Sequence, residues 1–290
     1  MIESILIIGL VNGGTYAILA VGFSLIFGVA RILNVAHTAF YMITAFLIYI
    51  ATGILGFPIY PSVILAILIT SLWGMVSYKL FFDRIKEHET AVMIIAIALA
   101  MLFQEIFLIA FGAPFNRIAP FIPGFLEIAG IRVLFQHIIA VGISLITLFC
   151  LWILLSKTKL GIKIRAIAQD REIANLMGIN VGWVCMTTMG ISVVLAGVSA
   201  AAVAPILGVN PYMWIHPLII VLAAVVLGGL GSIKGSIAAA FILGFAETTV
   251  VFLIPGGAFL RGAVSLSIMV IVLLVRPEGL FGVFFEEERV

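Results

Sequence analysis

The sequence predicts an all-α polytopic membrane protein with eight to nine transmembrane helices, some of them broken or re-entrant. Of the 290 residues, 64% are hydrophobic and only 10% are charged, whereas soluble domains carry about 25% charged residues. The mean hydropathy is +1.35, and the apolar runs reach the roughly 20 residues that a bilayer-spanning helix needs. This composition excludes a soluble globular domain, a disordered chain and a coiled coil. The net charge of +2 gives no basic face for a nucleic-acid partner.

Apolar segments alternate with short charged stretches along the whole chain. The expected segments are 5–27, 35–55, 61–80, 91–111, 137–155, 184–207, 217–230, 235–254 and 263–275. The segment at 217–230 is short for a span, so one segment is expected to be re-entrant. The turn between the first two segments is also short, which favours a broken or re-entrant helix there.

Lysine and arginine predict the orientation, because cytoplasmic loops carry an excess of these residues. The stretch 156–183 is a polar loop with five basic residues in its first part, and we place it in the cytoplasm. Alternation of the spans then puts twelve of the 15 basic residues inside and leaves only Arg117, Arg132 and Arg261 outside. This division predicts an outside N-terminus and a cytoplasmic C-terminus. The residues counted as inside are Arg31, Lys79, Arg84, Lys86, Lys157, Lys159, Lys163, Arg165, Arg171, Lys234, Arg276 and Arg289.

The polar loop contains the pattern of a short amphipathic helix. Asp170 is suited to cap its start and Gly178 to end it in the left-handed conformation. Ile173, Leu176 and Met177 then form one apolar face. Two interpretations remain open from the pattern alone: a helix that docks in a partner's groove, or one that lies flat on anionic lipid.

Polar residues in the first two segments are candidates for a substrate pathway. Asn buried in a membrane needs partners, and glycines either break a helix or let helices pack closely. The functional interpretation is a pathway lined by broken-helix backbone, and the structural one is helix packing. The candidates are Asn12, Gly13, Gly14, Tyr16, Asn34 and His37.

Two carboxylates, Glu105 and Glu247, fall within apolar runs, and an intramembrane ionisable group is a functional-site hypothesis by default. Glu247 is the stronger pathway candidate because it lies nearer the middle of its segment. No Cys/His spacing predicts a metal site. A glycine-dense run lacks the phosphate-loop spacing and predicts a tight turn at Gly228, Gly229, Gly231 and Ser232.

The chain resembles the permease subunit of branched-chain amino acid ABC importers, the LivH-like high-affinity leucine/isoleucine/valine type, over nearly its full length. The resemblance is carried by six stretches in a fixed order. They are GLVNGGTYAILAVGFSLIFG at 9–28, ILNVAH at 32–37, GIKIRAIAQD at 161–170, ANLMGIN at 174–180, AVVLGGLGSI at 224–233 and RPEGLFG at 276–282.

The resemblance implies a single permease domain over 1–290, with a cytoplasmic coupling loop at 156–183 that docks on an ATPase subunit. The spacing Glu172-x-Ala174-x3-Gly178 is similar to the family's coupling motif, with Ile in place of one Ala. The coupling residues expected on this basis are Arg165, Asp170, Glu172, Ala174, Leu176 and Gly178.

The implied protein is not an enzyme but a translocator of branched-chain amino acids, in the cell membrane of a prokaryote. It would bind no cofactor itself, and ATP and Mg would be held by partner subunits. The implied partners are a second homologous permease subunit, two cytoplasmic ATP-binding subunits and an extracytoplasmic solute-binding protein.

Two departures from the family pattern bear on the substrate: Thr38-Ala39 replaces an expected Gly-Glu, and His216-Pro217 replaces an expected stretch with glycine and lysine. Urea, amides or sugars are therefore alternative substrates of an ABC permease. An ion-coupled secondary transporter using Glu105 and Glu247 is the alternative of a different class.

Overall fold

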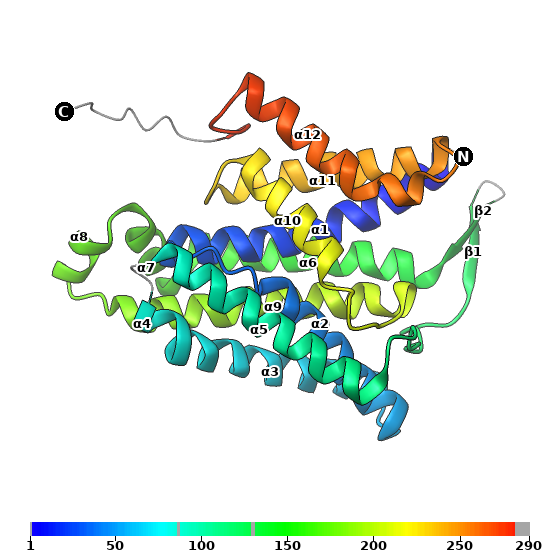
Figure 1. The fold of residues 1–290 in the computed structure, drawn as a ribbon, viewed down its shortest axis with the longest axis horizontal. Coiled ribbons are helices and arrows are strands. Elements are labelled where there is room, and N and C mark those ends of the chain that lie inside the picture. Colours follow the sequence, from blue (N-terminus) through cyan, green and yellow to red (C-terminus); the bar gives the residue numbers. More distant parts are fainter. Residues whose placement is uncertain (1, 86–87, 129–130, 282–290) are drawn as a thin grey trace.

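The computed structural model describes residues 2–85, 88–128 and 131–281. Lys86 and Arg289, which belong to the predicted cytoplasmic set, lie outside the described residues, as does Gly282 of the last quoted stretch. The described chain is a bundle of long apolar helices with one two-stranded hairpin (Figure 1). The prediction of an all-α polytopic membrane protein is confirmed.

Eight helical segments of the described chain are long and apolar enough to cross a membrane, and a ninth apolar helix, α10, is shorter. These numbers match the eight to nine spans that the sequence predicted. The short helix α10 corresponds to the predicted segment 217–230, which was expected to be short for a span. The eight are α1 (Ile2–Ala30), α2 with η1 (His37–Tyr49, Ile50–Ile54), α3 with η2 and α4 (Ile59–Ser77, Tyr78–Phe82, Asp83–Ile85), α5 (Glu89–Phe111), α6 (Phe135–Lys157), α9 (Val181–Leu207), α11 (Ile233–Leu253) and η3 with α12 (Gly257–Leu260, Arg261–Val275). The short helix α10 is Ile215–Gly228.

The bundle has two distinct ends. At one end, called here the hairpin end, lie the start of α1 and the strands β1 (Phe125–Ile128) and β2 (Ile131–Leu134) (Figure 1). At the opposite end, called here the coupling end, lie the short helices α7 (Lys159–Gln169) and α8 (Arg171–Leu176) (Figure 1). The long helices run between these two ends, so the loop predicted to be cytoplasmic and the start of α1 lie at opposite ends.

Helix α1 is central to the bundle and is continuous across its glycines. An atom at the Cβ position of Gly244 on α11 would lie 2.6 Å from the backbone nitrogen of Gly13, so the two backbones cross in close contact. Gly14 faces Ser144 of α6 in the same way. Of the two interpretations left open for Gly13 and Gly14, the structure shows close helix packing, because α1 continues unbroken through both residues and neighbouring helices approach where the side chains are missing.

The chain does break between α1 and α2. Arg31 has a φ of 56°, a left-handed conformation in which α1 ends, and residues 31–36 form no long helix. The next helix then begins with His37, whose Nε2 lies 3.1 Å from the carbonyl oxygen of Leu19. Leu19 lies roughly 16 Å before the end of α1 at 1.5 Å per residue. Helix α2 therefore starts at mid-depth, which confirms the prediction of a broken or re-entrant turn there.

Two elements were absent from the sequence prediction. Strands β1 and β2 pair antiparallel with Glu127 opposite Arg132, whose side chains form an exposed ion pair of 3.3 Å. Helix α7 occupies the part of 156–183 that was predicted to be a loop. Its Ile164 and Ile167 are buried, while Lys163 and Arg165 face outward. The sequence analysis recognised the amphipathic pattern at 170–178 but not this shorter one directly before it.

Candidate functional site

Helix α8 has the local geometry that the sequence predicted. The carboxylate of Asp170 accepts hydrogen bonds from the backbone N–H groups of Glu172 (2.8 Å) and Ile173 (2.9 Å), which caps the helix start. At the other end the N–H of Ile179 donates to the carbonyl of Ala174, and Gly178 has a φ of 80°. This is the Schellman arrangement that favours glycine at that position.

The apolar face of α8 is open in the described chain. Ile173 is 59% exposed, Leu176 is 85% exposed and Met177 is 78% exposed. Ala174 lies on the opposite face and is buried, so α8 rests on the bundle through a small residue. Three large apolar side chains at one end of the molecule thus form a surface suited to a partner's groove.

Arg171 ties α8 to the transmembrane helices, a role the sequence analysis did not assign. Its guanidinium donates to the carbonyl oxygen of Ala30 at the end of α1 (3.3 Å) and lies 3.9 Å from the sulfur of Cys185 on α9. A displacement of α8 would therefore pull on two long helices. Sequence reasoning missed this role because the partners lie far along the chain and one of them is a backbone carbonyl. Arg165 and Glu172, the remaining predicted coupling residues, are exposed at the same end.

A cavity of about 350 Å³ opens among the helices toward the hairpin end. Its volume falls in the range of about 300–1,000 Å³ that is typical of small-molecule sites. Two predicted pathway residues, Asn12 and Tyr16, line it. The wall comprises Asn12, Thr15, Tyr16, Leu19, Tyr41, Phe115, Ser199, Val203, Leu207, Gly208, Asn210, Tyr212, Met213, His216, Pro217 and Arg261.

Glu247 is the centre of a polar cluster behind this wall. Its side chain is fully buried, and its carboxylate accepts hydrogen bonds from Tyr16 of α1 (3.2 Å) and Ser265 of α12 (2.7 Å). His216 of α10 places its Nε2 at 3.7 Å from the same carboxylate. The structure thus connects two residues of the predicted pathway, Tyr16 and Glu247, that are far apart in sequence.

Two basic residues of the cavity wall have unused hydrogen-bonding capacity. The Nε of Arg261 and the Nε2 of His216 are buried without a hydrogen-bond partner among the described residues, and both residues line the cavity. A buried donor without a partner costs about 1–3 kcal/mol, a cost that a polar partner near these two side chains would offset. The sequence marked Arg261 only as an outer-loop charge, because the other residues of the cavity wall lie far from it along the chain.

Asn12 is held at the cavity wall, because its amide donates a hydrogen bond to Thr248 of α11 (3.1 Å). The other polar candidates of the first two segments, Asn34 and His37, lie off the wall. Their side chains are fully buried among the helices and do not reach the cavity. The Nδ2 of Asn34 donates to the sulfur of Met189 on α9 (3.4 Å).

A second cavity of about 690 Å³ lies at the coupling end and is lined by Phe27, Gly28 and Arg31 together with Gly231 and Ser232. The tight turn predicted at 228–232 is confirmed. Gly229 and Gly231 have φ values of 97° and 82°, and the hydroxyl of Ser232 accepts from the N–H of Gly235 to cap α11.

The two cavities are separated by a short buried stretch of α1. The wall of the first cavity ends at Leu19 and that of the second begins at Phe27, a rise of roughly 12 Å along the helix. A chain of two contacts joins His37 of α2 to this stretch. The Nδ1 of His37 lies 3.1 Å from the hydroxyl of Ser192 on α9, and that hydroxyl donates to the carbonyl oxygen of Gly22 on α1 (2.7 Å). Helices α1, α2 and α9 therefore meet in one barrier between the cavities.

Glu105 does not join the cluster. It lies on the exposed face of α5, and it accepts a hydrogen bond from its neighbour Gln104 (3.1 Å). Gln104 in turn accepts from the indole N–H of Trp214 (2.8 Å). The two intramembrane carboxylates of the sequence analysis thus occupy different environments, and of the two only Glu247 contacts residues of the cavity wall, Tyr16 and His216.

Comparison with known proteins agrees with this architecture. Residues 5–273 match the family model described as the permease component of branched-chain amino acid transport systems. The chain is 29% identical to the high-affinity branched-chain amino acid transport system permease protein BraD of Pseudomonas aeruginosa, across 96% of this chain and 94% of BraD. It is 27% identical to the corresponding permease protein LivH of Escherichia coli K12, across 94% and 93% of the two chains.

A solved structure shares the fold. A chain of PsaBC from Streptococcus pneumoniae, in complex with Fab, aligns with a TM-score of 0.54 at 16% identity, covering 94% of this chain and 92% of that chain. At this identity the likeness concerns the fold alone. The match to the family model, in contrast, spans nearly all of the transmembrane helices, and the chain therefore belongs to the permease-component family of branched-chain amino acid transport systems.

Proposed function

We propose that this chain is the permease subunit of an ATP-driven importer, and that it passes branched-chain amino acids from the hairpin end to the coupling end. One observation carries the proposal: a polar-walled cavity and an exposed coupling helix lie at opposite ends of one bundle. A permease that is driven by ATP hydrolysis on separate subunits needs both a cavity for the substrate and a surface on which those subunits can dock. The family membership and the names of the relatives support the substrate class.

The chemistry of the cavity suits a free amino acid. The guanidinium of Arg261 would pair with the α-carboxylate, as arginine favours such planar anions. The carbonyl and amide oxygens of Asn12 and Asn210 would accept from the ammonium group. Val203, Leu207 and Met213 supply an apolar wall for a branched aliphatic side chain.

The coupling mechanism follows from the contacts of α8. Two ATP-binding subunits would hold ATP and Mg, and one of them would bind the face of Ile173 and Leu176. Their closure would move α8, and the bond of Arg171 to Ala30 would transmit the movement to α1. The helices around the barrier would then shift as rigid bodies between outward-open and inward-open arrangements. This chain would bind no cofactor and catalyse no reaction.

Charge distribution supports the orientation. Most of the described lysines and arginines lie at the coupling end, where Lys157 ends α6 and Lys159, Lys163 and Arg165 belong to α7. The positive-inside rule assigns that end to the cytoplasm. In the cell membrane of a prokaryote, the hairpin end would then face an extracytoplasmic solute-binding protein, and a second homologous permease subunit would complete the complex.

Reconstitution of the complete complex in proteoliposomes tests the proposal. Replacing Arg261 with Gln should lower leucine uptake per ATP hydrolysed by about tenfold, because a hydrogen bond to a charged group contributes about 1.5–3 kcal/mol. The matched control is Arg117→Gln, which removes an exposed arginine that lies off the cavity wall. Equal uptake by the Arg261 variant and the control would contradict the proposed pathway.

Thiol labelling tests the same pathway independently of transport. In a Cys150→Ser background, a cysteine at Asn12 should react with a polar thiol reagent and be protected by leucine. A cysteine at His37 should stay unreactive in the same conformation, because that position is fully buried and off the cavity wall. Labelling of position 12 that leucine does not affect would assign Asn12 to packing alone.

A further inference from the structure

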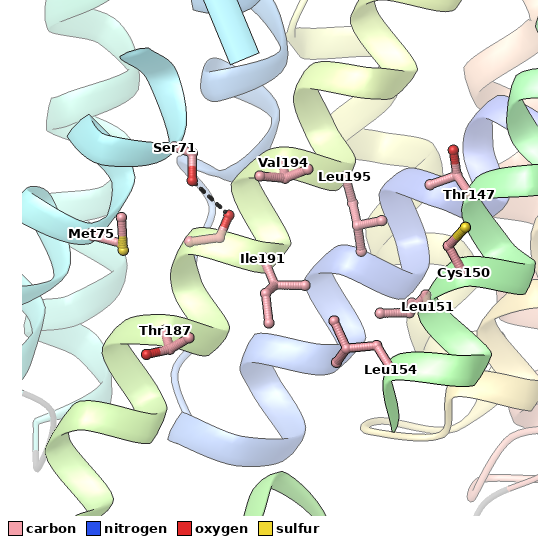
Figure 2. Close-up of a pocket in the computed structure, with 11 residues that line it drawn as sticks. Ser71, Met75, Thr147, Cys150, Leu151, Leu154, Thr187, Ile191, Val194 and Leu195 are labelled. Carbon is pink, nitrogen blue, oxygen red and sulfur yellow. Dashed lines mark hydrogen bonds between the residues drawn. The ribbon is translucent and has the colours of Figure 1, made fainter. Parts of the chain in front are cut away.

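A groove of about 380 Å³, separate from the two cavities, lies on the outer surface of the bundle between α3, α6 and α9 (Figure 2). Leu151 and Leu154 of α6 face Ile191 and Leu195 of α9 across it. Among the described residues that line it, none is charged. The groove is thus shaped by apolar side chains and lies within the membrane-spanning part of the helices.

The groove lies where α3 and α6 flank α9 without packing on each other. Helix α3 is in close contact with α9, since the hydroxyl of Ser71 donates to the carbonyl of Gly190 (3.1 Å). Helix α6 packs on α1, where Ser144 touches Gly14, and on α9, where Gln136 donates to the carbonyl of Ala202 (3.0 Å). Beyond Ser144 toward the coupling end, the space between α3 and α6 is not filled by the described chain.

Basic and aromatic residues follow the groove at the coupling end. Trp183 lies one turn before Thr187 on α9 and is half-exposed, and the ammonium of Lys163 lies 6.0 Å from its ring centroid. Lys157 ends α6 one turn beyond Leu154. Tryptophan and lysine at the end of an apolar surface are the residues that meet lipid headgroups at a membrane interface.

We propose that this groove binds one acyl chain of an anionic phospholipid, whose phosphate lies near Lys157 and Lys163. Charge complementarity at one end and an uncharged wall along the rest fit this occupant. The lipid would fill the space between α3 and α6 and leave the substrate cavity untouched. The site concerns the surface of the bundle and does not depend on the proposed function.

Native mass spectrometry of the complete complex tests the site. The complex is exchanged into equimolar phosphatidylglycerol and phosphatidylethanolamine with identical acyl chains, and the retained lipid is counted. We expect phosphatidylglycerol to be retained in preference by about 30-fold, because each basic residue near the headgroup contributes about a factor of five. The double variant Lys157→Gln/Lys163→Gln should lose this preference while still retaining a lipid.

A groove-filling variant separates this site from general lipid contact. Ile191→Trp should abolish the retained lipid, while Leu145→Trp, on the exposed face of α6 and outside the groove, should leave it in place. Equal retention of the two lipids by the wild-type complex would overturn the proposal. So would retention that Ile191→Trp does not change, or a variant complex whose two permease subunits separate, which would indicate that protein covers the groove.

Discussion

Leu176 on α8 offers the sharpest test of coupling, because its side chain is 85% exposed in the described chain. Full burial of a leucine side chain stabilises an association by about 1.5–3 kcal/mol. Leu176→Ser should therefore weaken binding of the ATP-binding subunits by about 2 kcal/mol, which corresponds to roughly 30-fold in Kd. The fold of the permease should be unaffected, since the replaced side chain makes little contact with it.

The assay is a titration of immobilised permease in nanodiscs with the purified ATP-binding subunits, followed by the ATPase rate at saturation. The matched control is Ile162→Ser, which removes an exposed aliphatic side chain (57% exposed) from neighbouring α7. We expect the control to bind within about twofold of wild type, a change well under 1 kcal/mol. A Leu176→Ser variant that binds as tightly as the control would refute the assignment of α8 as the docking surface.

Three further substitutions have defined outcomes. Gly244→Ala should cost about 1–3 kcal/mol through overpacking against Gly13, and a lower melting temperature of the purified permease would reveal it. Arg171→Gln should leave binding of the ATP-binding subunits intact but reduce substrate-stimulated ATPase activity, since the link to Ala30 is lost; full stimulation would argue against that link. Gly178→Ala places a Cβ in a left-handed conformation at a cost of about 1–2 kcal/mol, so amide exchange in α8 should accelerate, and unchanged protection would contradict the capping role.

Local features were predictable where the chemistry is local. The capping of α8 by Asp170 and its end at Gly178 depend on residues within one short segment, and both were recognised from spacing alone. The turn at Gly229 and Gly231 was predictable for the same reason. The spans were predictable because burial in lipid demands about 20 apolar residues whatever the tertiary structure.

Features that depend on distant contacts were not predictable. Glu247 was singled out as an intramembrane carboxylate, but its partners could not be named, because Tyr16, His216 and Ser265 come from three other helices. The glycines at 13 and 14 were compatible with either a break or a close crossing, and only the position of α11 decides between them. Arg261 could be recognised only after the helices had brought it to the cavity.

The central claim is that ATP bound to separate subunits drives amino acid movement through this chain. The most direct measurement is uptake of radiolabelled leucine into proteoliposomes that hold the complete complex, with the solute-binding protein outside and ATP enclosed. Our account predicts accumulation only with hydrolysable ATP inside, and its loss when the ATP-binding subunits are omitted. Accumulation driven by a proton gradient with those subunits absent would contradict it and would favour an ion-coupled transporter that uses Glu247.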